Sequence, residues 1–160
     1  MKSEKTEIQL APMDLRKTIS ECVDFFAVQT KEKNLYLDSA IDEEIPNMLI
    51  ADESGIKQIL INLISNAVKF TEKGGISLDI KGFDKYNNKT TLCFMVNDTG
   101  IGIQEEFLDR IFLPSEQEGA GNGLSASYDL AEKMGGCLTA TSTPREGSCF
   151  VLTLTLDLSM

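Results

Sequence analysis

The 160-residue sequence contains no histidine at all. Without an imidazole the chain can form neither a Ser-His-Asp triad nor a Cys-His pair, and it supplies no histidine ligand to a metal. Its four cysteines lie far apart and no C-x-x-C spacing occurs. We therefore expect neither a zinc site nor a disulfide framework, and we interpret the cysteines as reduced core thiols.

Long apolar runs and excess positive charge are missing as well. No apolar run approaches the roughly 20 residues that a membrane-spanning helix needs, and residues 1–5 lack the apolar centre of a signal peptide. We therefore expect a soluble chain without direct membrane contact. The 15 basic and 25 acidic side chains give a formal net charge of −10, which disfavours general binding to nucleic acid.

The length and the 42% hydrophobic content suit one folded domain with a sizeable core. Helix-like and strand-like segments alternate, and no linker is long enough to divide the chain, so we expect one domain over residues 1–160. Strand-like segments occur in adjacent pairs as well as singly. This pattern predicts an α+β fold of two layers, with a mixed sheet covered by helices on one face.

The hydrophobic periodicity predicts the approximate positions of these elements. We expect longer helices at 12–31, 52–71 and 124–134, and a short one near 105–111. We expect strands at 8–11, 35–41, 48–51, 76–83, 90–96, 137–142 and 149–156.

The helix expected to follow Asp52 carries an unusual polar side. Asn62, Asn66 and Lys69 cluster on one side of it, and its buried stripe is formed by Ile56, Ile59, Leu60, Leu63, Ile64, Ala67 and Val68. Asparagine is a mediocre helix former, costing about 0.5 kcal/mol relative to alanine. The side is either an ordinary exposed face or a ligand surface, since an amide oxygen can coordinate Mg²⁺ and an ammonium can neutralise phosphate.

Two glycine-containing segments offer further ligand chemistry. Asp98 ends an apolar strand and is followed by Gly100 and Gly102, so its carboxylate could accept a hydrogen bond from an exocyclic amine such as that of adenine. A tight turn is the alternative. Gly121 and Gly123 lead into a helix at Leu124, whose free N–H groups would suit an anion, although neither a dinucleotide fingerprint nor a P-loop is present.

Taken together and in this order, the motifs N-x-x-x-N-A-x-K-F at 62–70, D-x-G-x-G at 98–102 and G-x-G-L at 121–124 resemble the ATP-binding domain of sensor histidine kinases. That family shares its nucleotide fold with gyrase, Hsp90 and MutL-type ATPases. The resemblance covers nearly the whole chain and includes L-D-R-I-F at 108–112 and M-G-G at 134–136. It implies a Bergerat-type fold, a mixed sheet of about five strands under about three helices.

The resemblance also implies a role for each matching residue at the base. Asp98 would bind the adenine amino group, helped by Ser148 through a water, and Phe70 would pack on the base. Gly100, Gly102 and Ile103 would begin the lid over the nucleotide, and the backbone amides of Gly121, Gly123 and Leu124 would cradle the phosphates.

Three residues of the first motif would carry the catalytic roles. Asn66 would supply an oxygen to Mg²⁺, with Asn62 beside it, and Lys69 would contact phosphate. In the related ATPases a glutamate at the position of Asn62 activates the attacking water, and an amide cannot take that proton. We therefore expect hydrolysis to be slow, which argues against a simple hydrolytic ATPase.

The activity implied is binding of Mg²⁺–ATP and donation of the γ-phosphoryl group to a histidine in two-component signal transduction. Because the chain has no histidine, the acceptor would lie on a separate helical dimerisation domain, with a response regulator downstream. We expect the domain to be a monomer in isolation and to be cytoplasmic, or the cytosolic part of a membrane-anchored receptor.

One segment departs from the family pattern. The lid region after Phe112 is short and acidic, Ser115 stands where the family has a second phenylalanine, and no lysine or arginine occurs between Arg110 and Lys133. Charge in a phosphoryl-transfer transition state would then lack a lid cation. The alternative hypothesis is therefore a catalytically weak nucleotide-binding or scaffold module of the same fold.

Overall fold

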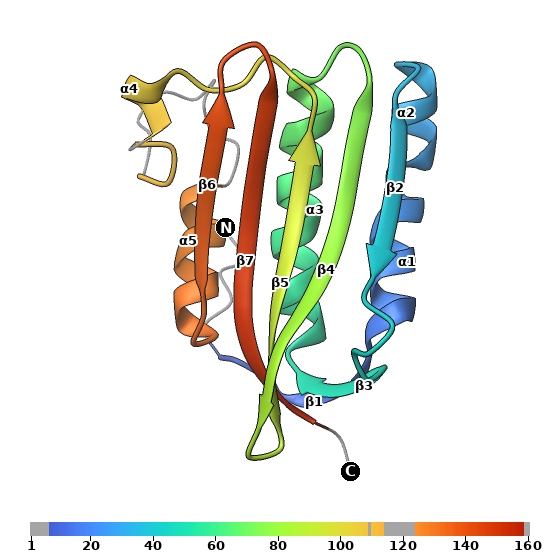
Figure 1. The fold of residues 1–160 in the computed structure, drawn as a ribbon, viewed down its shortest axis with the longest axis vertical. Coiled ribbons are helices and arrows are strands. Elements are labelled where there is room, and N and C mark those ends of the chain that lie inside the picture. Colours follow the sequence, from blue (N-terminus) through green and yellow to red (C-terminus); the bar gives the residue numbers. More distant parts are fainter. Residues whose placement is uncertain (1–6, 109, 114–123, 159–160) are drawn as a thin grey trace.

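Helices and strands alternate along the chain in the computed structural model, which describes residues 7–108, 110–113 and 124–158 (Figure 1). The helices are α1 (Leu15–Phe25), α2 (Ala27–Glu32), α3 (Glu53–Phe70), α4 (Glu105–Leu108) and α5 (Leu124–Lys133). The strands are β1 (Ala11–Asp14), β2 (Tyr36–Ile41), β3 (Met48–Ala51), β4 (Gly75–Tyr86), β5 (Lys89–Asp98), β6 (Cys137–Thr143) and β7 (Gly147–Leu158). Within these residues, no helix has the length and apolar character needed to cross a membrane.

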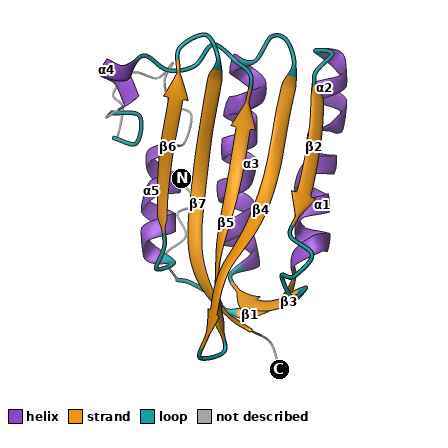
Figure 2. Cartoon of the chain, in the orientation of Figure 1, coloured by secondary structure: helices purple, strands orange, loops and turns teal. Residues whose placement is uncertain are grey.

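All seven strands form one mixed sheet in the order β1-β3-β7-β5-β4-β2, with β6 also paired to β7. Only β2 and β4 pair in parallel, and the other pairs are antiparallel. The helices α1, α3 and α5 lie together behind the sheet in Figure 2, so they form the second layer. The predicted α+β sandwich is confirmed.

The sheet contains the seven strands that the periodicity predicted, whereas the resemblance implied about five. The four-residue strands β1 and β3 pair with each other, and β3 meets the end of β7 at Leu158 and Asp157. This short pair extends the edge of the sheet beneath the helices, and it accounts for the additional strands.

The helix α3 packs its apolar stripe onto the centre of the sheet. The stripe residues predicted from the sequence are all buried, as are Leu92, Phe94 and Val96 on the facing side of β5. Burial of one such side chain contributes roughly 1.5–3 kcal/mol. The interface therefore fixes α3, and with it the polar residues near its C-terminal end, relative to β5.

The boundaries of α3 agree with the prediction. Asp52 caps its N-terminus, with a carboxylate oxygen 3.0 Å from the backbone nitrogen of Gly55, and the other carboxylate oxygen accepts from the backbone N–H of Gln9 at 3.1 Å. The helix ends at Phe70, and Thr71 has an extended backbone.

The helix predicted at 12–31 is wrong at its start and in its continuity. Residues up to Asp14 belong to β1, and the Asp14 carboxylate then caps α1 by accepting from the Lys17 N–H at 3.0 Å. The helix breaks at Phe26, whose φ of −105° and ψ of 5° separate α1 from α2. The strand predicted at 8–11 likewise begins only at Ala11. Residues 11–14 form a strand and not the start of a helix because they pair with β3, which is distant in the sequence.

The cysteines correct another expectation. All four are free, but only Cys22 is buried in the core. Cys93 and Cys149 are half-buried and Cys137 is exposed, because strand alternation turns all three to the face of the sheet that carries no helices.

Candidate functional site

A cavity of about 350 Å³ lies between the C-terminal part of α3, the end of β5, the start of β7 and α4. Most of its lining is apolar. Seven residues predicted from the sequence line it, namely Asn66, Phe70, Asp98, Gly102, Ile103, Leu124 and Ser148. The cavity therefore brings together side chains from all three predicted motifs.

Asp98 forms a half-buried acceptor at one end of this cavity. It is the last residue of β5 and pairs with Ser148 of β7 across the sheet. Its carboxylate accepts from the backbone N–H of Gly100 at 2.8 Å. Burial raises the pKa of Asp98, although the N–H groups of Gly100 and Ser148 favour the charged form and oppose that rise. A carboxylate held in this way is suited to a hydrogen-bond donor on a ligand.

The two glycines after Asp98 are required by close backbone approaches. A Cβ on Gly100 would lie 2.6 Å from the carbonyl oxygen of Phe70, and one on Gly102 would lie 2.3 Å from that of Thr143. Gly102 also has a φ of +77°, which favours glycine. Gly102 lines the cavity, whereas Gly100 lies behind Asp98 and does not.

The hairpin between β6 and β7 holds this loop in place. The hydroxyl of Ser142 accepts from the Ile103 N–H at 2.7 Å, donates to the carbonyl of Gly147 at 2.9 Å, and lies 3.1 Å from the Ser148 hydroxyl. The sequence-based reasoning missed Ser142. Strand alternation could have found it, since Ser142 shares the helix-covered side of β6 with Leu138.

On α3, only one of the three predicted catalytic residues lines the cavity. The buried Asn66 does so, and its amide nitrogen donates to the backbone carbonyl of Asn62 at 3.1 Å. The Asn62 amide instead donates to the Ser127 hydroxyl of α5 at 2.9 Å, and Asn62 is not among the lining residues. Lys69 is exposed, with its ammonium 5.2 Å from the ring centroid of Phe70. Asn62 thus links α3 to α5.

The chain's own donors fit a Mg²⁺ ion that arrives with a nucleotide. The described residues contain no group of three or more histidine, cysteine or acidic side chains that could hold a metal alone. Mg²⁺ is commonly bound through one or two protein oxygens together with substrate phosphates and water. The amide oxygen of Asn66 has the chemistry that suits Mg²⁺, whereas its nitrogen donates to the backbone carbonyl of Asn62.

Several cavity residues were not predicted. Besides Ile103, the loop and α4 contribute apolar side chains, and the full additional set is Ala67, Ile101, Gln104, Phe107, Ile111 and Phe150. Phe112 stacks on Tyr128 with ring centroids 5.2 Å apart and meets Phe150 edge-on at 6.1 Å, which supports this wall. The predicted residues Gly121 and Gly123 and the acidic lid after Leu113 lie outside the described residues.

Comparisons with known proteins identify the family to which the chain belongs. The sequence profile of the histidine kinase-, DNA gyrase B-, and HSP90-like ATPase family matches residues 51–158. The aerobic respiration control sensor protein ArcB of Escherichia coli K12 is 35% identical over 164 aligned positions, which cover 96% of this chain and 21% of ArcB. The chain thus spans about a fifth of that relative's length.

Solved structures show the same fold. Full-length ShkA in complex with AMPPNP superposes with a TM-score of 0.85 at 30% identity, covering 96% of this chain and 32% of that one. The catalytic domain of the histidine kinase ThkA superposes with a TM-score of 0.73 at 26% identity, covering 92% and 97%. The chain therefore belongs to the histidine kinase-, DNA gyrase B-, and HSP90-like ATPase family, and its relatives include a sensor protein and the catalytic domain of a histidine kinase.

Proposed function

We propose that residues 1–160 form the catalytic domain of a sensor histidine kinase, which binds Mg²⁺–ATP and donates the γ-phosphoryl group to a histidine on a separate helical dimerisation domain. One observation carries this proposal: the half-buried Asp98 carboxylate and the Asn66 amide, from two layers of the fold, line the same cavity. A base-binding acceptor and a metal-binding amide are what a purine nucleotide with its cation requires.

We assign the base of the nucleotide to one end of the cavity and its phosphates to the other. At the base end, Asp98 would accept a hydrogen bond from the adenine amino group, and Phe70 would cover part of the ring. At the phosphate end, Asn66 would contact the cation, which supplies charge neutralisation on the phosphates. Lys69 would reach phosphate only by leaving its position over the Phe70 ring.

The reaction proposed is a direct displacement. An imidazole nitrogen of the partner domain attacks the γ-phosphorus, the bond from that phosphorus to the bridging oxygen breaks, and ADP leaves. Asn62 suits this outcome, since an amide cannot deprotonate a water for hydrolysis. The acceptor must come from outside these 160 residues, because they contain no histidine.

The cellular setting is part of the same proposal. ArcB is named a sensor protein, and we infer by analogy that the phosphohistidine would serve a response regulator. A domain that uses ATP would operate in the cytoplasm, where it would be attached to the rest of its parent protein. By itself we expect it to be monomeric.

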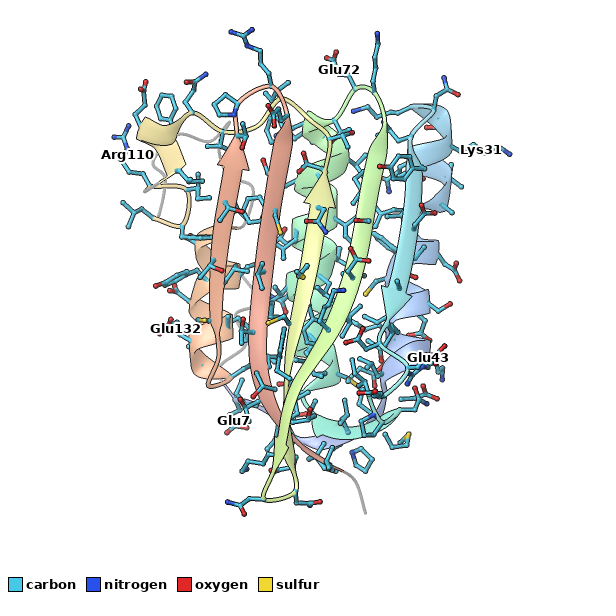
Figure 3. All side chains as sticks on the ribbon, viewed as in Figure 1. Glu7, Lys31, Glu43, Glu72, Arg110 and Glu132 are labelled. Atoms are coloured by element: carbon cyan, nitrogen blue, oxygen red, sulfur yellow. The ribbon has the colours of Figure 1, made fainter. Side chains whose placement is uncertain are left out.

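A second candidate function is a nucleotide-binding module with weak catalysis. This candidate is favoured because no lysine or arginine lines the cavity among the described residues, so a cation that would stabilise phosphoryl transfer is missing from that lining. Arg110, which directly precedes the lining residue Ile111, is exposed and lies 5.6 Å from the centroid of the Phe107 ring. Figure 3 shows Arg110 at the outer edge of the molecule beside α4.

Two measurements on the same protein separate these candidates. Calorimetry with the non-hydrolysable analogue AMPPNP, with and without Mg²⁺, tests nucleotide binding. Incubation with labelled ATP and a purified histidine-bearing dimerisation domain then tests transfer. Label on that histidine supports the kinase, tight binding without label supports the second candidate, and an absence of binding contradicts both. Rapid release of free phosphate would instead indicate a hydrolytic ATPase.

A further inference from the structure

Ser142 occupies a position from which it can control a neighbouring hydroxyl in the cavity. It lies on β6 opposite Ser148 of β7, and both are half-buried on the side of the sheet that faces the helices. Ser148 lines the cavity and pairs with Asp98 on its other side, whereas Ser142 stands behind it, one strand further out.

The contacts of the Ser142 hydroxyl fix the direction of its hydrogen bonds. A carbonyl oxygen can only accept, so the single hydroxyl proton of Ser142 goes to Gly147, 2.9 Å away. The two lone pairs of Ser142 are then available to the Ile103 N–H at 2.7 Å and to the Ser148 hydroxyl at 3.1 Å. The hydrogen-bonding capacity of Ser142 is therefore filled.

This arrangement determines what Ser148 offers to a ligand. Since Ser142 has no proton left for it, Ser148 donates its own proton to Ser142. The Ser148 oxygen then faces the cavity with lone pairs only. Next to it stands the Asp98 carboxylate, which also accepts. The two side chains together form a corner that takes donors and repels acceptors.

We propose that Ser142 is a positioning residue for base selectivity: it holds the Ser148 hydroxyl as an acceptor, so that this corner favours a 6-amino purine over a 6-oxo purine. The inference rests on the proposed function, because it assumes that a purine triphosphate enters this cavity. A 6-amino group donates to the corner, whereas the oxygen of a 6-oxo group would meet two acceptors.

The test compares affinities for ATP and for inosine triphosphate, which carries oxygen at position 6. In Ser142→Ala the Ser148 hydroxyl is released, and it can turn to donate to the 6-oxo group. We expect the preference for ATP over inosine triphosphate to fall by about tenfold, the effect of one redirected hydrogen bond. The measurement is calorimetric titration of each nucleotide with Mg²⁺, and circular dichroism checks that the variant is folded.

Further variants separate selectivity from simple loss of structure. Ser142→Thr keeps the hydroxyl and should retain the preference, and Ser142→Cys, with its weaker hydrogen bonds, should give an intermediate value even if the alanine variant folds poorly. Thr141→Ala, a change on the opposite face of the same strand, is the matched control and should leave the preference unchanged. In a Ser148→Ala background, Ser142→Ala should change the preference no further.

Two results would overturn the inference in different ways. An equal loss of affinity for both nucleotides in Ser142→Ala would show that Ser142 supports only the loop at Ile103, and the proposed function would survive. Failure of the unaltered protein to bind ATP would contradict the proposed function, and the role of Ser142 would fall with it.

Discussion

The two ends of the cavity are built differently. The proposed base end belongs to the sheet: Asp98 and Ser148 are paired on adjacent strands. The Gly100 N–H donates to the Asp98 carboxylate, and the Ser148 hydroxyl lies 3.1 Å from that of Ser142, so both side chains are held in place. The proposed phosphate end depends on side chains of α3. There Asn62 donates to Ser127 of α5, and Lys69, which does not line the cavity, has its ammonium over the Phe70 ring.

This difference indicates where rearrangement is needed. The base end has its hydrogen-bonding groups already oriented, so binding there costs little reorganisation. Among the described residues, Asn66 is the one predicted catalytic group that lines the cavity, and the other two, Asn62 and Lys69, would have to move to reach a bound phosphate. We therefore expect substitutions at the base end to affect binding most, and those at the phosphate end to affect it less.

The largest effect is expected for Asp98→Asn. Loss of the charged acceptor should weaken ATP binding about 100-fold, since hydrogen bonds to charged groups are among the strongest in proteins. Calorimetry with AMPPNP measures this, and Asp38→Asn, a change at an exposed carboxyl on β2, is the control. Equal affinities of the Asp98 variant and the unaltered protein would remove Asp98 from the site.

The next effect concerns Asn66→Ala. If the amide contacts the cation, this change should remove most of the Mg²⁺ dependence and weaken Mg²⁺–ATP binding by about tenfold, while metal-free binding stays nearly the same. Titration with and without Mg²⁺ separates the two contributions. Gln58→Ala, at an exposed position on the same helix, serves as the control. A uniform loss under both conditions would contradict a metal-binding role.

A smaller effect is expected for Lys69→Ala. An exposed ammonium interacts weakly with a ligand, so affinity for ATP should fall only about threefold, and the loss should shrink at high salt. The comparison is with Lys81→Ala, an exposed lysine on β4. A loss of affinity as large as that expected for Asp98→Asn would mean that the groups at the phosphate end are already oriented for binding. It would contradict the difference proposed between the two ends.

The smallest effect is one of pH on stability. Burial raises the pKa of Asp98, so between the ordinary value of 3.8 and the higher value in the folded state, the folded protein binds more protons than the unfolded one. Stability contributed by this group therefore falls as pH rises through that window. We expect Asp98→Asn to gain stability relative to the unaltered protein as pH rises from about 4 to 7, as measured by urea unfolding. The opposite trend would show that the carboxylate is stabilised in the fold.

The sequence predicted those parts of the fold that are set locally. Asp52 and the apolar stripe placed α3 within a residue at each end, because capping and helical periodicity are properties of nearby residues. The segment before Asp14 was predicted wrongly, since its strand depends on pairing with β3, more than thirty residues away. The extensions of β4 and β5 beyond the predicted ends also come from pairing between strands.

The same distinction applies to the site. Asp98, Asn66 and Phe70 stand in recognisable motifs, and the structure places them on one cavity. Ser142 and Phe107 stand in no motif, and their positions at the site follow from a strand pairing and from the fold of a loop. Only three-dimensional contacts reveal that Asn62 is bonded to Ser127 of another helix.

The uncovered face of the sheet has a practical consequence for measuring these effects. Cys137 is exposed there, on the opposite side of the sheet from the cavity. Burial, in contrast, raises the pKa of Cys22 to about 11 and keeps that thiol unreactive. A maleimide fluorophore should therefore attach first at Cys137. Titrations could then follow an optical signal without an engineered cysteine.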